Sequence, residues 1–368
     1  MSRVNSVLMT ADAVGGVWTY AIDLSRELSA RGIHVTLAVM GPPPSQAQHL
    51  EVARLRDVML HVGPFRLEWM DDPWDDVAVA GDWLLDLERR SRADVVHLNG
   101  YCHAALPWQS PIVVVGHSCV RSWWRAVHGC NPPAAWDRYW HEVRRGLQSA
   151  NAVITPSEAM LGALREHYGP LPRTSVIHNG RVRQPSPLSK EALIFSAGRL
   201  WDPAKNISAL DAAAPMVPWP IAVAGDRGAD IRQIEPEGRV RYLGRVAPVE
   251  LQQWLARASI YAAPARYEPF GLSVLEAASA GCALVLGDIP SLRELWEDAA
   301  LYVDPGDHVA LAHALTTLAD DVDRRTRLMD LARTRAAMFT PARMADAYCD
   351  LYTELLGERR PVLSLSAV

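Results

Sequence analysis

Short apolar runs alternate with longer stretches of helical spacing along most of the chain. The runs are continuous and rich in Val and Ile, which is typical of strands buried on both faces of a parallel sheet. In the first half of the chain they lie at Val4–Met9, Val35–Met40, Val58–Val62, Val95–Leu98, Ile112–Val115, Val153–Thr155 and Val176–His178. Helical spacing covers Val17–Ala30, Ala78–Arg89 and Ala134–Leu147. This half therefore predicts an α/β unit whose parallel sheet is covered by helices.

The same alternation restarts after Arg183–Lys190, a segment with two prolines and no periodicity. Further strands are predicted at Ala192–Ser196, Ile221–Ala224, Val240–Leu243, Ile260–Ala263, Ala283–Leu286 and Ala300–Val303. Further helices are predicted at Asn206–Ala214, Pro248–Ala258, Leu272–Ala280, Val309–Leu318 and Asp323–Ala337, and an amphipathic segment follows at Ala342–Leu356. Two α/β units of similar size favour two Rossmann-like domains, residues 1–185 and 190–345, followed by a last stretch, 346–368.

Composition and charge narrow the class of protein. The 368 residues are 49% hydrophobic and 21% charged, which are globular proportions. The net charge of −5 provides no basic footprint for nucleic acid at the level of the whole chain. No apolar stretch is long enough to span a bilayer. The five cysteines are widely spaced without a CxxC pair, so neither a zinc site nor a disulfide framework is expected, and a reduced, cytoplasmic protein is predicted.

Two carboxylates bracket a predicted helix start that follows the strand Ile260–Ala263. Glu268 lies in the loop before the helix, and Glu276 lies just over one turn into it. Between them, Gly271 permits close approach of the backbone, and the free amides from Leu272 onward form an anion site. A molecule that carries both a phosphate and polyhydroxylated rings suits this arrangement. The alternative is a pair of solvated charges, which the apolar neighbours of Glu276 disfavour.

Two cations follow the first strand of the second unit. Arg199 and Lys205 are six positions apart, across a loop that contains Pro203. A planar guanidinium and a compact ammonium that converge after a strand would neutralise a diphosphate. Of the 37 basic residues only Lys190 and Lys205 are lysine, which gives a weak hint that a guanidinium does not fit at position 205. A pair of solvated loop cations is the alternative.

A glycine pair opens the first predicted helix. Gly15 and Gly16 follow the first strand, where glycine lets the backbone approach a phosphate. A tight turn between strand and helix is the simpler explanation, and both interpretations stay open on this pattern alone.

Three of the twelve histidines are candidates for a functional role. His117 comes directly after the strand Ile112–Val115, and ligands gather at the carboxyl ends of parallel strands. His97 ends another predicted strand and is the reserve candidate, while His103 is placed to face an acceptor. A structural role for His117 is the competing interpretation. No histidine pair has the HExxH spacing of a zinc hydrolase.

Residues 121–145 form an aromatic and basic zone. The zone contains Trp123, Trp124, Trp136, Tyr139 and Trp140 together with Arg121, Arg125, Arg138, Arg144 and Arg145. Aromatic faces pack against sugars, which favours an acceptor surface, and Trp with Arg also suits peripheral contact with the inner face of a membrane. Core aromatics on one helix face, with solvated Arg opposite, are the alternative.

In these motifs the chain resembles the retaining nucleotide-sugar glycosyltransferases of family 4, which have the GT-B fold. The resemblance rests on Glu268–Glu276 with its Pro-Phe-Gly, on the Gly-Arg…Lys-Asn loop and on the N-terminal Gly-Gly, and it runs from about residue 5 to about residue 345. It implies two Rossmann-like domains that face each other across a cleft, with an acceptor domain at 1–185, a donor domain at 190–345 and a helix in 346–368 that crosses back to the first domain. It also implies no metal and no cofactor besides the nucleotide-sugar.

The resemblance implies roles for individual residues. In the second domain Glu276 would hold the ribose hydroxyls of the donor, and Glu268 would hold sugar hydroxyls. The donor-binding set continues with the amides of Phe270, Gly271 and Leu272 and with Arg199 and Lys205 on the diphosphate. In the first domain Gly16 would meet the donor phosphate, and His117 would lie close to the transferred sugar.

The activity implied is transfer of a hexose from a UDP-sugar or GDP-mannose class donor to a hydroxyl acceptor such as a growing glycan, a lipid-linked sugar or a small metabolite. Two rivals stay open: another GT-B enzyme such as a UDP-sugar 2-epimerase, and a sugar-nucleotide binding protein without catalysis. Nucleic acid is not an expected partner. The location expected is cytoplasmic, with peripheral contact at the inner membrane face.

Overall fold

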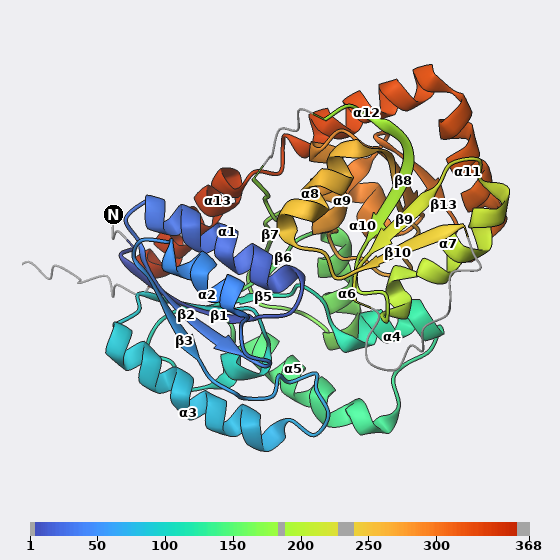
Figure 1. Ribbon diagram of the computed structural model, residues 1–368. Helices are drawn as coiled ribbons and strands as arrows, with labels where there is room; N and C mark the ends of the chain where they lie inside the picture. Colours follow the sequence, from blue (N-terminus) through green and yellow to red (C-terminus); the bar gives the residue numbers. More distant parts are fainter. Residues whose placement is uncertain (1–3, 183–187, 227–238, 359–368) are drawn as a thin grey trace, which may run out of the picture.

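Two parallel sheets, each covered on both faces by helices, lie side by side in the molecule (Figure 1). The structure is a computed structural model that describes residues 4–182, 188–226 and 239–358. Most of the predicted linker, residues 183–187, and the end of the last stretch, residues 359–368, lie outside the described residues.

The first sheet has seven strands in the order β3-β2-β1-β4-β5-β6-β7, all parallel. Its strands are β1 Ser6–Asp12, β2 His34–Met40, β3 Val58–Val62, β4 Val95–Leu98, β5 Ile112–Val115, β6 Ala152–Thr155 and β7 Thr174–Val176. Its helices are α1 Gly16–Ala30, α2 Gln46–Ala53, α3 Trp74–Ser91, α4 Val120–His128, α5 Asp137–Ser149 and α6 Glu158–Tyr168. Apolar side chains are buried against both faces of the sheet, as the continuous apolar runs require.

The second sheet has six strands in the order β10-β9-β8-β11-β12-β13, again all parallel. Its strands are β8 Glu191–Ala197, β9 Ile221–Ala224, β10 Val240–Gly244, β11 Ala258–Ala263, β12 Ala283–Gly287 and β13 Ala300–Val303. The helices around it are α7 Ile207–Ala213, α8 Pro248–Arg257, α9 Leu272–Ser279, α10 Pro290–Trp296, α11 His308–Asp320 and α12 Val322–Ala336.

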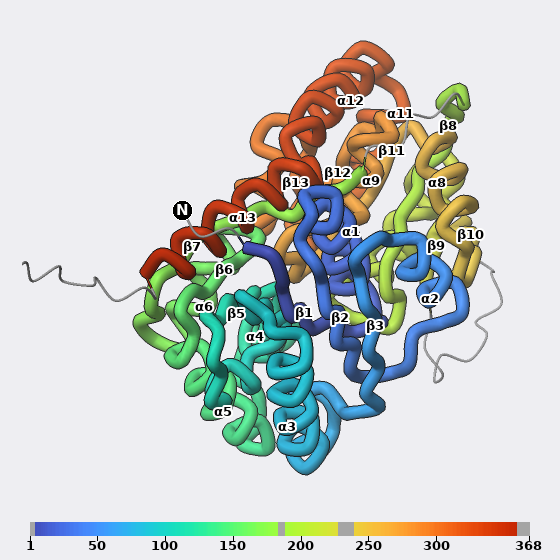
Figure 2. Tube along the Cα trace, turned by 90° about the vertical axis from the view of Figure 1, so that its left-hand side faces the viewer, coloured from blue at the N-terminus to red at the C-terminus, as the bar shows by residue number. Residues whose placement is uncertain are grey.

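The last helix, α13 Pro341–Glu358, returns to the first sheet although it follows the second one in the chain. It packs against α1, and Tyr348 and Tyr352 are fully buried in the apolar core beside β1 and β4. Figure 2 shows α13 beside the first sheet, although α13 and α1 lie near opposite ends of the sequence. The predicted crossover helix is confirmed, and the fold is that of two Rossmann-like domains facing across a cleft.

The predicted elements match the observed ones with several exceptions. The pattern gave no helix for α2, α4, α6 or α10, all of which are short or only partly apolar. The stretch predicted as one helix from Ala134 instead begins with a 3-10 turn, Ala134–Trp136, before α5. The strand predicted at Val176–His178 is β7, which ends at Val176.

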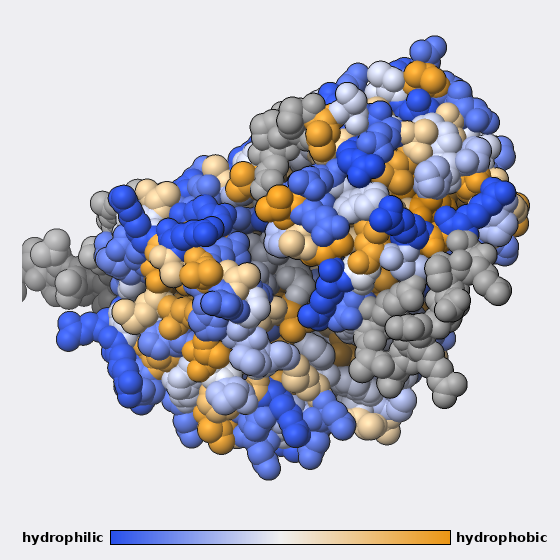
Figure 3. Space-filling view, viewed as in Figure 1, coloured by the Kyte–Doolittle hydropathy of each residue, from blue (hydrophilic) through white to orange (hydrophobic). Residues whose placement is uncertain are grey.

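Both sheets place a topological switch point at the same cleft. In the first sheet the chain leaves β1 toward β2 and later returns to β4, on the other side of β1. In the second sheet β8 separates β9 from β11 in the same way. Ligands bind outside the carboxyl ends of strands at such points. On the face shown in Figure 3, hydrophilic and hydrophobic residues are interspersed. Within the described ranges no helix has the length and hydropathy needed to cross a bilayer.

Candidate active site

A cavity of about 810 Å³ lies between the two sheets, at the carboxyl ends of their central strands. All nine residues predicted to form the site line it, namely Gly16, His117, Arg199, Lys205, Glu268, Phe270, Gly271, Leu272 and Glu276. Residues that lie up to 260 positions apart in the sequence therefore meet in one cavity (Gly16 and Glu276). The functions assigned to them remain predictions.

The helix α9 points its N-terminus into this cavity. Gly271 is its N-cap with φ of 86°, a left-handed conformation that glycine adopts without strain, and no side chain caps the helix. The first backbone amides of α9 are therefore free to bind an anion or a hydroxyl. Gly271, Leu272 and Ser273 line the cavity directly.

Lys205 and Glu268 form an ion pair in the cavity wall, with 2.5 Å between Nζ and Oε2. Both side chains are largely buried, at 20% and 15% exposure. The family resemblance implies a diphosphate as the ligand of Lys205 and sugar hydroxyls as the ligands of Glu268. An ammonium has three donors and a carboxylate has about four acceptor positions, so the pair retains capacity for both ligands.

Arg199 lies at the end of β8 and is held by two neighbours. Its Nη2 donates to Asp202 at 2.9 Å, and its guanidinium lies 5.5 Å from the ring centroid of Trp201. The other oxygen of Asp202 accepts from Trp123 Nε1 of helix α4 at 3.0 Å. This contact joins the aromatic zone of the first domain to the cationic loop of the second.

The helix α1 faces the cavity from the opposite side. Gly15 is its N-cap with φ of 75°, and again no side chain caps the helix. A Cβ at Gly15 would lie 3.5 Å from Arg199 Nη1, and one at Gly16 would lie 3.5 Å from Leu272 Cδ1. The glycine turn thus brings two helix N-termini and a guanidinium to one place, where an anion is favoured. Beside it, burial raises the pKa of Asp12 to about 6, although the amide of Val14 and the nearby Arg199 oppose this rise.

His117 is held in one tautomer by its neighbours. Asn99 Nδ2 donates to the carbonyl of Thr10 at 2.6 Å, so Asn99 Oδ1 faces the imidazole Nε2 at 2.8 Å and accepts from it. The ring also packs edge-on against Tyr20, with 4.5 Å between centroids. Burial lowers the pKa of His117 to about 3. The imidazole is therefore neutral at ordinary pH, and Nδ1 is its hydrogen-bond acceptor.

The reserve candidate His97 has a structural role instead. Its ring is fully buried between Tyr20 Oη at 3.1 Å and Tyr352 Oη at 2.5 Å, and it does not line the cavity. The suggestion that it can replace His117 in catalysis is wrong, because its strand position turns it toward the crossover helix. His103 does line the cavity, and one ring nitrogen is already bound to the carbonyl of Val77 at 3.0 Å.

The aromatic and basic zone divides into two parts. Trp123, Trp124, Trp136 and Tyr139 line the cavity, as an acceptor surface would. Trp140 instead donates from Nε1 to the carbonyl of His167 at 2.8 Å and lies under Arg121 and Arg144. The packing alternative therefore holds for part of the zone.

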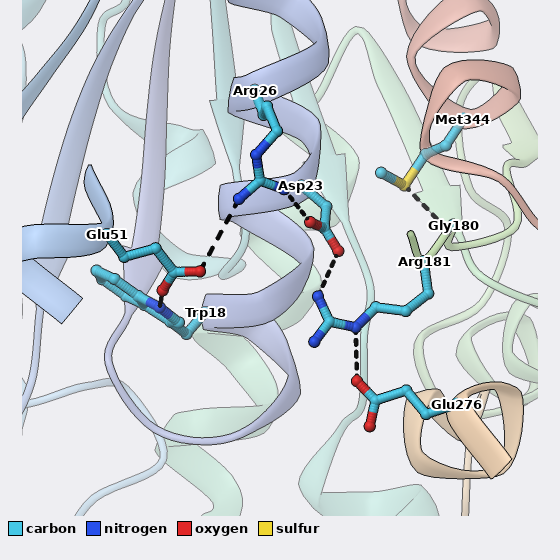
Figure 4. A network of polar contacts seen from close by, with 8 residues as sticks. All are labelled: Trp18, Asp23, Arg26, Glu51, Gly180, Arg181, Glu276 and Met344. Atoms are coloured by element: carbon cyan, nitrogen blue, oxygen red, sulfur yellow. Dashed lines mark hydrogen bonds and ion pairs between the residues drawn. The ribbon is translucent and has the colours of Figure 1, made fainter. Parts of the chain in front are cut away.

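Sequence reasoning missed two groups that join the domains. Tyr267 directly precedes Glu268, and its hydroxyl accepts from the amide of Cys119 at 3.3 Å, two residues after His117. Arg181 follows β7 and bridges Asp23 of α1 to Glu276 of α9 (Figure 4). Tyr267 stands next to a predicted site residue, which is a signal that the sequence contained, whereas Arg181 lies five positions beyond the end of β7 and carried no such signal.

Comparison with known proteins identifies the family. Residues 14–182 match the sequence profile described as Glycosyltransferase Family 4, and residues 191–321 match that of Glycosyl transferases group 1. The chain belongs to glycosyltransferase family 4. It is thus a glycosyltransferase (class EC 2.4) that takes its sugar from a nucleotide-sugar.

Three relatives from this comparison have different names and cover different shares of this family 4 chain. It is similar to a D-inositol 3-phosphate glycosyltransferase of Corynebacterium efficiens, with 25% identity over 92% of the chain and 90% of the relative. It is 29% identical to a glycogen synthase of Mycobacterium tuberculosis over 75% of the chain and 73% of the relative. It is 37% identical to O-antigen chain mannosyltransferase B of Escherichia coli, but over only 33% of the chain and 35% of that protein.

Solved structures confirm the GT-B-like fold of this family 4 enzyme. A sucrose-phosphate synthase from Thermosynechococcus elongatus superimposes with a TM-score of 0.79 at 19% identity, over 96% of this chain and 100% of that one. HepE of Anabaena, in complex with UDP and glucose, has a TM-score of 0.74 at 17% identity, over 95% and 100%.

Proposed function

We propose that this enzyme is a retaining hexosyltransferase that uses a UDP-sugar or a GDP-mannose class donor and transfers the sugar to a hydroxyl acceptor. The observation that supports this is the composition of the cavity. Arg199, Lys205, Glu268 and Glu276 are among the charged side chains that line it, and the uncapped N-termini of α1 and α9 face it from the two domains. The positive groups suit a diphosphate, and the carboxylates suit the hydroxyls of ribose and sugar.

In this proposal residues 190–345 bind the donor. Arg199, Lys205 and the start of α9 hold the diphosphate and stabilise the charge that develops as it leaves, which is the largest contribution expected of such a site. Glu276 accepts from the ribose hydroxyls. Glu268, oriented by Lys205 at 2.5 Å, accepts from the sugar hydroxyls.

Residues 1–185 bind the acceptor, and the helix within 346–368 completes this domain. The neutral His117 orients the transferred sugar by accepting through Nδ1. The donor phosphate itself takes the proton of the attacking hydroxyl on the same face of the sugar, so the anomeric configuration is retained. The cavity-facing tryptophans offer stacking surfaces for a glycan, a lipid-linked sugar or a small metabolite. A cytoplasmic location, with peripheral contact of the aromatic and basic zone at the inner membrane face, belongs to the same proposal.

The donor is tested by calorimetry against UDP, GDP and ADP, in the presence of a chelator. We expect one of them to bind without added metal ions, because Arg199, Lys205 and the two helix N-termini supply the positive potential. Binding that disappears in chelator and returns with Mg²⁺ or Mn²⁺ would contradict the role of these groups.

The reaction is tested with the sugars of the nucleotide that binds. Proton NMR of the product should show the donor's anomeric configuration, and an inverted anomer rules out the retaining mechanism. Release of free sugar in the absence of acceptor separates a transferase from a binding protein, which releases none. A product altered at C2 identifies the 2-epimerase alternative.

A further inference from the structure

A chain of charged side chains connects the first domain to Glu276 (Figure 4). Arg181 Nε donates to Glu276 Oε1 at 2.6 Å, and its Nη1 donates to Asp23 Oδ2 at 2.9 Å. The other oxygen of Asp23 accepts from Arg26 Nη1 at 2.5 Å, and Arg26 in turn lies 3.9 Å from Glu51. One guanidinium thus binds a carboxylate on α1 and a carboxylate on α9 at once.

This part of the molecule is shielded from water. The side chains of Asp23, Glu276 and Arg181 are 1%, 12% and 26% exposed. A buried carboxylate is costly without a partner, and a guanidinium has a rigid set of donors that serves two acceptors with fixed geometry. Both oxygens of Asp23 are occupied by arginines, whereas Glu276 uses only Oε1 toward Arg181.

The backbone of Arg181 is also fixed. Its amide donates to the carbonyl of Phe339 at 3.1 Å, so the two segments that cross between the domains are bonded to each other. At the preceding Gly180 a Cβ would lie 2.2 Å from the carbonyl carbon of Thr340, a contact that no side chain can make. Arg181 therefore extends from a tightly packed junction, and its guanidinium has little freedom to follow a moving carboxylate.

We propose that Arg181 is a positioning residue for nucleotide recognition. Arg181 binds Oε1 of Glu276 and leaves Oε2 for the ribose hydroxyls. Because Arg181 also binds Asp23, it fixes the Glu276 carboxylate relative to the first domain. This inference rests on the proposed function, in which Glu276 contacts the ribose. Ribose recognition then depends on the junction between the domains as well as on α9.

The test compares nucleotides with and without ribose hydroxyls. Calorimetry measures Kd for UDP, GDP and ADP and for their 2′,3′-dideoxy counterparts, with the wild type and Arg181→Gln. We expect the wild type to bind its ribonucleotide at least tenfold more tightly than the dideoxy form, and Arg181→Gln to lose most of this ratio while its Kd for the dideoxy form stays nearly unchanged. Arg26→Gln is the matched control: it also removes a partner of Asp23 but none of Glu276, so it should keep the ratio.

Each outcome decides between the interpretations. Equal weakening of both nucleotides in Arg181→Gln, or an unchanged ratio, overturns the positioning role. A wild type that binds no nucleotide, or binds both forms equally, contradicts the proposed function and this inference with it. If Arg181→Gln does not fold, Arg181→Lys replaces it, because an ammonium keeps a charge beside Asp23 but lacks the fork that spans two carboxylates. It should fold and lose the ratio, and a retained ratio in this variant overturns the inference.

Discussion

At the residue scale, His117 is the side chain whose chemistry the structure constrains most. The bond to Asn99 places the proton on Nε2, and the pKa of about 3 keeps the ring neutral. The buried ring is neutral at neutral pH, which suits a role in orienting the sugar through the acceptor Nδ1.

We therefore predict that His117→Ala lowers kcat by roughly 100-fold, the scale of one positioned hydrogen-bonding group, with little change in nucleoside-diphosphate affinity. The pH dependence of kcat in the wild type should show no change due to titration of His117 between pH 8 and 5. Steady-state kinetics and melting temperature are measured together. A variant that melts earlier but keeps full activity per folded molecule would assign His117 to packing against Tyr20 alone.

Substitutions of the two glutamates of the site should have different effects. Glu276→Ala removes a charged acceptor of the ribose and should weaken nucleoside-diphosphate binding by about 1.5–3 kcal/mol, or roughly 10- to 150-fold. Glu268→Ala should spare this affinity, because it frees Lys205 for the diphosphate, but should slow turnover of the sugar donor. Calorimetry with the nucleotide and kinetics with the sugar donor check both effects. Equal loss of nucleotide affinity in the two variants would reject this division.

Residues of the site differ in how far the sequence could predict them. Glu268, Glu276, Arg199 and Lys205 stand in short segments next to predicted strands, so local pattern was enough. The pairing of Arg181 with Asp23 spans 158 positions and depends on how the domains meet, which no local pattern contains. The reason for a lysine at position 190 became visible only in the structure, where its Nζ donates to the carbonyls of Leu255 and Ala258 and to the sulfur of Cys282.

At the scale of elements, the strands could be predicted because both sheets are buried on both faces and give continuous apolar runs. The helices α4 and α6 could not, since they carry mixed faces that contact the opposite domain, as Trp123 does through Asp202. The same limit explains why His97 was a reserve candidate for catalysis. The sequence shows that His97 ends a strand, but it does not show that α13 packs against β4 and α1.

His97 joins three elements, β4, α1 and α13, and this should make folding sensitive to acid. Burial, followed by the nearby His117, lowers the pKa of His97 to about 3, so the unfolded chain takes up a proton below about pH 6.5 that the folded chain refuses. The free energy of unfolding therefore has its full value with respect to His97 above pH 6.5. It falls as the pH decreases toward 3, by at most about 1.4 kcal/mol per pH unit.

His97→Gln keeps a donor and an acceptor for the two tyrosines but does not titrate. Between pH 6.5 and 5.5 its free energy of unfolding should fall by about 1 kcal/mol less than that of the wild type. The exposed His313→Gln serves as control and should behave like the wild type. Denaturant unfolding at several pH values measures the difference, and identical pH slopes for all three proteins would contradict the assignment.

At the scale of the whole molecule, the two domains are bonded to each other at the rim of the cavity. Glu294 of α10 accepts from the amides of Glu158 and Ala159, at 2.8 and 2.9 Å, and so caps the N-terminus of α6 in the opposite domain. A carboxylate at a helix N-terminus is favoured by the free amides and the helix dipole. Ser157 of the same cap donates to the carbonyl of Pro269, next to Glu268.

Loss of this contact should favour separation of the domains and lower the fraction of molecules in the state that binds the donor. We expect Glu294→Ala to raise KM for the donor several-fold, the effect of about 1 kcal/mol on a two-state equilibrium, with little change in kcat. The radius of gyration from small-angle scattering should increase without nucleotide and return toward the wild-type value when nucleotide is saturating. Arg293→Ala is the matched control on the same helix, because Arg293 pairs with Asp288 of its own domain and not across the cleft. If the control shifts KM as much as Glu294→Ala does, or if neither the scattering nor KM responds to Glu294→Ala, the contact does not hold the domains together.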